Sequence, residues 1–245
     1  MAKQKYPKII IFNMGGTHGH FLRYTLDKFC TTTPEIKQLP FNSLGNSHLN
    51  IQYSGQFLFE EPNKEEPGEL EFEHKNMIYI DLDQDVLYYE RVNLHRAGDV
   101  GTDLFSESAI EKTLRDRGNT FPDYCKNKNI SLKDGFMYGF KNILAQGSVV
   151  RNKKFISKLL SKNYNMYLYK IKNFFNVQNY KESILKIGNY FNLEFDLTGI
   201  EELYAEFYKR NTILRSHSKV EEYLNGNKSV KLDILQQAYV DAFTN

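Results

Sequence analysis

KIIIFNMGGTHGHFLRYTLDKF, residues 8–29, decides how the rest of the chain is interpreted. The stretch opens on the continuous apolar run IIIF (9–12), which is typical of a short strand buried on both faces. It ends on apolar residues at helical spacing, from Phe21 to Cys30. Between the two lies NMGGTHGH, which places three glycines, a threonine and two histidines in the turn from strand to helix.

A glycine-rich turn from a parallel strand into a helix is a place where an anion can bind. Glycines allow a tight turn and let an oxyanion approach the backbone N–H groups closely. The start of the helix adds unpaired N–H donors and a partial positive charge. The candidate anion-binding residues are Gly15, Gly16, Thr17, His18, Gly19 and His20. The plainer alternative is that the glycines only make a tight turn.

The spacing of these glycines differs from both common nucleotide-binding fingerprints. The Walker A motif requires lysine and then Ser or Thr after its last glycine, whereas His20 and Phe21 follow Gly19 here. The dinucleotide pattern GxGxxG fails as well, because these glycines are spaced GGxxG. The loop therefore predicts an anion site without the Walker lysine, in which His18 and His20 replace the usual cation.

The rest of the chain alternates between strand and helix patterns. An alternating run that ends at residue 59 indicates a strand or hairpin. Further strands are predicted at 77–83 and 166–175, and helices follow the later strands. This is the α/β pattern, with intervals long enough for parallel crossovers. We therefore expect a single domain over residues 1–245, built as a central parallel sheet flanked by helices with a helical C-terminal third.

The composition fits this expectation and narrows the functional classes. The chain has 245 residues, of which 41% are hydrophobic and 25% charged, and its net charge is only +2. These values are ordinary for a globular protein, and they give no basic field that would indicate a nucleic-acid partner. No apolar run reaches the roughly 18 residues of a membrane span, and no secretory signal is visible. We expect a cytoplasmic protein with no membrane partner, in which Cys30 and Cys125 are free thiols.

Two segments carry a resemblance to a known family. NMGGTHGHFLRYTLDKF (13–29) resembles the 5′-phosphosulfate loop of the sulfotransferase superfamily, where a Gly-Thr step precedes a helix that opens with an aromatic residue and a leucine. Residues 167–211, YLYKIKNFFNVQNYKESILKIGNYFNLEFDLTGIEELYAEFYKRN, are similar to the C-terminal stretch of sulfotransferase-like proteins from phages and bacteria. Together the two segments cover about a quarter of the chain.

The resemblance implies a P-loop-like fold and a metal-independent enzyme. Its donor would be 3′-phosphoadenosine 5′-phosphosulfate (PAPS), and its acceptor a hydroxyl on a glycan or small metabolite. The loop amides, Thr17 and a histidine would stabilise charge on the transferred group. His20 or His48 would be the base that takes the acceptor proton.

One feature departs from that family. Many sulfotransferases end a strand with an arginine that binds the 3′-phosphate of the donor, whereas the strand MIYIDLD (77–83) ends in acids. The nearest basic candidates are Arg91 and Arg96 on the following predicted helix. The missing arginine favours an alternative, which is a non-catalytic phage or host-interaction protein that keeps the fold. A metal-dependent nucleotide kinase is a weaker alternative, because the Walker lysine is absent.

Two other segments have open interpretations. RNTILRSHSK (210–219) is basic and rich in hydroxyls, so it is predicted to be a loop over a nucleotide phosphate or a polar linker between helices, with His217 at the surface or the rim of the site. Three aspartates occupy every second position after a strand: Asp81, Asp83 and Asp85. This pattern is compatible with a metal site, although helix capping by Asp83 or Asp85 is the simpler explanation.

Overall fold

The computed structural model describes residues 8–12, 17–32, 57–60, 74–82, 125–126, 129–135, 137 and 146–244. The chain divides into two compact units. The first comprises residues 1–83 and 152–211, and the second comprises residues 84–151 and 212–245. The expectation of one domain over 1–245 stays a prediction.

Four short strands form a parallel sheet in the first unit, in the order β2-β1-β3-β4. The strands are β1 (Ile9–Phe12), β2 (Phe57–Glu60), β3 (Asn76–Asp81) and β4 (Asn165–Lys170). Every residue of β1 is buried, as its unbroken apolar run predicts for a strand covered on both faces. The α/β class, the central parallel sheet and the flanking helices are therefore confirmed.

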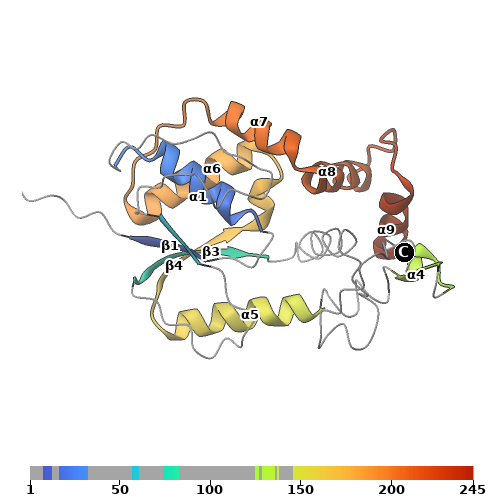
Figure 1. Cartoon of the computed structure of the whole chain (residues 1–245), viewed down its shortest axis with the longest axis horizontal. Helices are drawn as coiled ribbons and strands as arrows, with labels where there is room; N and C mark the ends of the chain where they lie inside the picture. Colours follow the sequence, from blue (N-terminus) through green and yellow to red (C-terminus); the bar gives the residue numbers. More distant parts are fainter. Residues whose placement is uncertain are drawn as a thin grey trace, which may run out of the picture. The chain divides into compact units, whose positions relative to one another are not determined.

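Helices cover both faces of this sheet (Figure 1). The helices α1 (Gly19–Phe29), α6 (Val177–Phe191) and α7 (Ile200–Arg210) lie on one face. On the opposite face lies α5 (Gln146–Ser161), whose residues from Asn152 onward belong to this unit. The centroid of the Phe12 ring lies 5.6 Å from that of Tyr79 and 5.7 Å from that of Phe155 in α5. Aromatic side chains therefore pack between this face of the sheet and α5.

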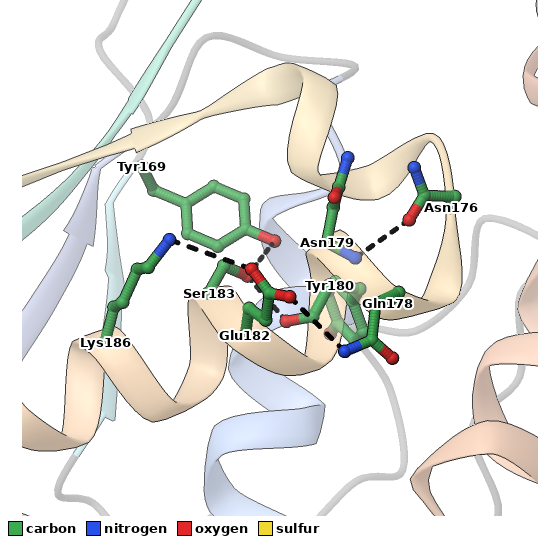
Figure 2. A network of polar contacts seen from close by, with 8 residues as sticks. All are labelled: Tyr169, Asn176, Gln178, Asn179, Tyr180, Glu182, Ser183 and Lys186. Carbon is green, nitrogen blue, oxygen red and sulfur yellow. Dashed lines mark hydrogen bonds and ion pairs between the residues drawn. The ribbon is translucent and has the colours of Figure 1, made fainter.

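The helix α6 shows why these residues form these elements (Figure 2). Asn176 precedes the helix, and its side chain accepts a hydrogen bond of 2.8 Å from the Asn179 backbone N–H. This cap satisfies one of the donors that a helix start leaves unpaired. The buried Ser183 hydroxyl donates to the Tyr180 carbonyl at 2.6 Å and lies 3.1 Å from the Tyr169 hydroxyl. These contacts tie α6 to the end of β4.

The predicted strand 166–175 is correct only for its first part. β4 ends at Lys170, and a 3-10 helix, η4 (Ile171–Phe174), follows it. Lys170 pairs with Asp81, the last residue of β3, so the strand ends where its neighbour ends. The ring of Phe174 then packs 5.1 Å from that of Tyr169. Tertiary packing thus overrides the strand propensity of the aromatic residues.

The described part of the second unit is helical. It contains α4 (Leu132–Gly135), α8 (Thr212–Leu224) and α9 (Ile234–Thr244). The prediction of a loop or linker at 210–219 is wrong, because most of that segment lies in α8. Leu214, His217 and Val220 are buried at helical spacing, and His217 is only 4% exposed rather than at the surface. The helical C-terminal third is confirmed.

Two further expectations can be checked on the described residues. Cys30 and Cys125 are free thiols, as predicted, and the structure shows that both are buried. Within the described ranges, no helix combines the length and the apolar composition needed to cross a membrane.

Candidate functional site

The elements that follow β1 and β3 lie on opposite faces of the sheet. β1 is followed by α1 on one face, and β3 is followed within this unit by α5 on the other (Figure 1). β1 and β3 are neighbours, with Phe12 opposite Tyr79. In open parallel sheets, ligands bind outside the carboxyl ends of two strands whose connections diverge in this way. The glycine loop begins at this position, because it follows Phe12.

The N-terminus of α1 presents backbone donors near this position. His18 is the residue that precedes the helix, and its side chain makes no capping hydrogen bond. The first turn contains no acidic side chain. The first amides of a helix have no acceptor within the helix, and the helix dipole adds a partial positive charge there. Helix termini of this kind are common anion sites in proteins, and the anion site that the sequence indicates here stays a prediction.

His18 has an unusual backbone and an apolar environment. Its φ of 62° and ψ of 20° lie in the left-handed region, which few residues other than glycine adopt. The half-buried ring meets Phe174 and Phe207 edge-on, with centroid distances of 5.3 and 5.2 Å. Asn211 Nδ2 lies 3.4 Å from His18 Nδ1. Burial lowers the pKa of His18 to about 4.

His18 is therefore neutral at pH 7, and it does not supply the positive charge that a Walker lysine would bring. It can still contribute a neutral hydrogen bond, so its role in ligand binding stays a prediction. The aromatic rings around it come from η4 and α7, far along the sequence. The structure thus joins the two segments that resemble sulfotransferases in one cluster.

The other predicted site residues divide into two groups. Thr17 and Gly19 are buried, and His20 is half-buried in the first turn of α1. The remaining predicted residues lie outside the described part of the chain: Gly15, Gly16, His48, Arg91 and Arg96.

A second group of polar side chains lies at the end of β3. The Tyr79 hydroxyl donates to Asn152 Oδ1 at 2.8 Å, and Asn152 Nδ2 donates to Asp81 Oδ1 at 2.7 Å. All three side chains are buried. The sequence indicates only Asp81, as an acid after a strand. Asn152 carries no signal, because it lies in an ordinary helical pattern.

Hydrogen bonds from α6 support the first turn of α1. The Tyr180 hydroxyl donates to Thr25 Oγ1 at 2.7 Å, and the Thr25 hydroxyl donates to the Phe21 carbonyl at 3.0 Å. The Phe21 ring stacks on Phe207 with centroids 3.8 Å apart. These contacts hold α1 rigidly, which favours a fixed orientation of its N-terminal amides.

The described residues give no sign of a metal centre, since no three His, Cys, Asp or Glu side chains among them gather as metal ligands would. Comparison with known proteins yields no match to a family model, to a curated protein or to a solved structure. The interpretation of the site therefore depends on its own geometry and on the sequence resemblance.

Proposed function

We propose that the chain binds PAPS at the carboxyl ends of β1 and β3 and transfers its sulfuryl group to a hydroxyl on a glycan or small metabolite. The observation that carries this proposal is the position of the N-terminus of α1. This terminus has no side-chain cap, and it follows β1 at the edge of the sheet where the connections after β1 and β3 leave on opposite faces. The resemblance of residues 13–29 to a phosphosulfate loop selects a sulfate donor among anionic ligands. A P-loop-like fold and a cytoplasmic location are parts of the same proposal.

The residues have distinct roles in this proposal. The first-turn amides of α1 would stabilise negative charge on the sulfuryl oxygens, as fixed donors do in other group transfers. His20 lies in that turn and is the candidate base or donor. His18 would support the loop through its aromatic neighbours. The donor supplies the activated sulfuryl group. Arg91 and Arg96, the sequence candidates for its 3′-phosphate, lie outside the described residues.

The described residues fit the sulfate end of such a donor through backbone groups. A helix terminus of this kind accepts any singly or doubly charged oxyanion, whether sulfate or phosphate. The lack of charge on His18 at neutral pH limits the affinity that the loop can reach.

A second candidate is a non-catalytic protein that keeps the fold. Two observations favour it. His18 is neutral. Both neighbours of β1 in the sheet also end in an acidic residue, Glu60 opposite Phe12 in β2 and Asp81 two residues beyond Tyr79 in β3, and like charge repels an anion placed beside them. The two candidates share the fold and differ in whether the donor binds.

Thermal unfolding with and without 3′,5′-adenosine bisphosphate separates these candidates. A ligand that binds only the folded chain at 100 times its Kd stabilises it by about 2.7 kcal/mol, so the Tm should rise. We expect this rise with or without Mg²⁺. No rise at millimolar ligand would leave the non-catalytic candidate, and a Mg²⁺-dependent rise with ATP alone would indicate a kinase.

The variant Gly16→Val tests the position of the ligand. A branched side chain would block close approach of an oxyanion to the loop backbone. We expect Gly16→Val to unfold at the same urea concentration as the wild type but to lose the rise in Tm. A rise that persists in this variant would show that the ligand binds elsewhere.

A further inference from the structure

We propose that the outer side of α5 and the adjoining edge of β4 bind the surface of a membrane that contains acidic phospholipids. The residues of this surface, which we call the α5 face, are Lys153, Lys154, Lys158, Leu160, Leu168 and Lys170. The α5 face is independent of the proposed donor site, because α5 and α1 lie on opposite faces of the sheet (Figure 1). Binding at a membrane surface needs no spanning helix, so it would revise the expectation that the chain has no membrane partner.

Positive charge is concentrated in one segment of the chain. From Asn152 to Phe175 the sequence contains six lysines and no aspartate or glutamate. The whole chain has a net charge of only +2, so this segment carries more positive charge than the complete protein. The small net charge therefore conceals a strongly basic region, and a local field of this kind attracts anionic partners.

The helix α5 directs this charge outward, because its apolar side packs on the sheet. Phe155 and Leu159 are buried one turn apart. Lys153 and Lys154 are exposed, and Lys158 is half-buried one turn after Lys154. Leu160 lies seven residues, or two turns, after Lys153 and is 55% exposed. The outer side of α5 thus presents both ammonium groups and an aliphatic side chain.

The strand β4 extends this surface at one end of the strand order. Successive side chains of a strand point to opposite faces of the sheet. The ring of Tyr167 and the hydroxyl of Tyr169 both contact side chains of α6. Leu168 and Lys170 therefore point to the face that α5 covers, and both are exposed. They add a second leucine and a further lysine to the α5 face.

The opposite face of the sheet has a balanced charge pattern. The helices α6 and α7 contain four glutamates beside their basic residues, and Lys181 forms an ion pair with Glu201. In contrast, α5 contains no acidic residue. Lys153, Lys154 and Lys158 form no ion pair with any residue that the structure describes. The two faces thus differ in charge, and this difference would orient the unit against a negatively charged plane.

The composition of the α5 face is unfavourable in water. Lys154 and Lys158 are four residues apart, and like charges at this spacing destabilise a helix. No carboxylate within α5 offsets this repulsion. Leu160 and Leu168 also leave much apolar surface in water, with 55% and 40% of each residue exposed. A partner that is both anionic and apolar would make both features favourable.

An acidic membrane fits these features better than a nucleic acid does. Lysine side chains can lie along apolar surface while their ammonium groups stay at the level of the lipid phosphates. Leucine side chains gain free energy when they leave water at the boundary of the acyl chains. A nucleic-acid backbone would use the lysines alone. Tyr190, an exposed aromatic side chain suited to stacking on a base, belongs to α6 on the other face of the sheet.

Sedimentation of the full chain with lipid vesicles tests this proposal. The vesicles contain phosphatidylcholine alone or with phosphatidylserine at a ratio of about two to one. We expect binding to the mixed vesicles at about 0.1 M salt, and at least tenfold weaker binding to the neutral ones. About 1 M salt should release the chain, because the Debye length falls from about 10 Å to about 3 Å. No binding to the mixed vesicles at low salt would overturn the proposal.

A pair of double variants locates the contact. Lys153→Gln with Lys154→Gln should weaken binding to the mixed vesicles about tenfold to thirtyfold, because each lysine near an acidic surface contributes about fivefold. Lys186→Gln with Lys209→Gln removes the same charge from exposed positions of α6 and α7 and should change binding by less than about twofold. Glutamine and lysine have similar helix propensities, so urea unfolding should match the wild type in both. Equal weakening in the two double variants would mean that net charge alone matters and would overturn the proposal.

A second pair of variants separates a membrane from a nucleic acid. Leu160→Gln should weaken binding to the mixed vesicles about fivefold, because an aliphatic side chain no longer enters the lipid. Leu185→Gln is the matched control, since Leu185 is 48% exposed but lies in α6 on the other face of the sheet. If a DNA duplex of about 20 base pairs displaces the chain from the vesicles and Leu160→Gln binds them as the wild type does, the α5 face is a phosphate-binding surface and the membrane assignment is wrong.

Discussion

At the scale of the residue, His18 links the stability of the fold to acid. Burial lowers the pKa of its ring to about 4, from an ordinary value of about 6.5. Between these pH values the unfolded chain binds a proton that the folded chain does not. The contribution of His18 is therefore complete above pH 6.5 and declines as the pH falls towards 4.

His18→Asn should remove this decline and leave a folded protein, because asparagine tolerates the left-handed backbone of this position. We expect the loss of unfolding free energy between pH 7 and 4.5 to be smaller in the variant by about 2 kcal/mol. Urea unfolding at the two pH values measures this difference. Equal losses in both proteins would mean that the ring titrates as it does in the unfolded chain.

Buried tyrosines predict the opposite dependence in alkali. Burial is the main cause that raises the pKa of Tyr169, Tyr180 and Tyr204 above the usual value of about 10. The unfolded chain loses these protons above pH 10 and the folded chain retains them, so stability is complete below pH 10 and falls above it. Each such tyrosine contributes a slope of about 1.4 kcal/mol per pH unit.

Tyr180→Phe isolates one of these contributions. The variant loses the hydrogen bond to Thr25, so its stability at pH 8 should be lower by about 1 kcal/mol. Its decline between pH 10 and 11, measured by urea unfolding, should nevertheless be less steep than that of the wild type. An identical slope would contradict the buried, protonated state of the Tyr180 hydroxyl.

At the scale of the element, Gly188 sets how closely α6 approaches the chain that follows it. A Cβ built at Gly188 would lie 2.8 Å from the Leu193 carbonyl oxygen and 3.1 Å from the Phe195 ring. Gly188→Ala should therefore destabilise the fold by about 1–3 kcal/mol through overpacking, even though alanine favours the helix by about 1 kcal/mol.

Asn189→Ala in the same helix is the control for Gly188→Ala. Asn189 is exposed, so only helix propensity changes and the variant should be neutral or slightly more stable. Urea unfolding of both variants separates contact from propensity. Equal stability of Gly188→Ala and Asn189→Ala would contradict this prediction. It would mean that the chain after α6 moves away from the added methyl group with no loss of unfolding free energy.

Elements with a strong local pattern could be predicted from the sequence, and those set by distant contacts could not. The run IIIF predicts β1 because continuous β-branched residues suit a doubly covered strand. The charged and hydroxyl residues of 210–219 are typical of a loop, and they obscure the helical spacing of the buried Leu214, His217 and Val220 that identifies α8. The end of β4 depends on where β3 ends, and no local pattern contains that information.

The candidate site shows the same division. The glycine loop predicts an anion near the start of α1, because strand, turn and helix are adjacent in the sequence. The neutral state of His18 depends on Phe174 and Phe207, more than 150 residues away along the chain. The bond between Asn152 and Asp81 likewise joins residues 71 positions apart. Such contacts arise only when the layers of the fold come together.

At the scale of the whole molecule, the topology predicts where a ligand changes the dynamics of the chain. β1 and β3 are each paired on both sides, and most of their residues are fully buried, so their amides should exchange with solvent only when the first unit unfolds. Hydrogen exchange without ligand should therefore be slowest in these two strands. The ends of the strands and the first turn of α1 should exchange faster through local opening.

Addition of 3′,5′-adenosine bisphosphate should slow exchange in two places that are far apart in the sequence: residues 17–22 and residues 80–82. The first segment contains the start of α1 and the second contains the end of β3, the strand that pairs with β1, and the proposed ligand lies between them. The exposed turn at 225–229 should serve as an internal control with unchanged exchange. Slowing only at 210–219 would instead assign the ligand to α8, and the doubly covered sheet would then be a scaffold without a site at its carboxyl edge.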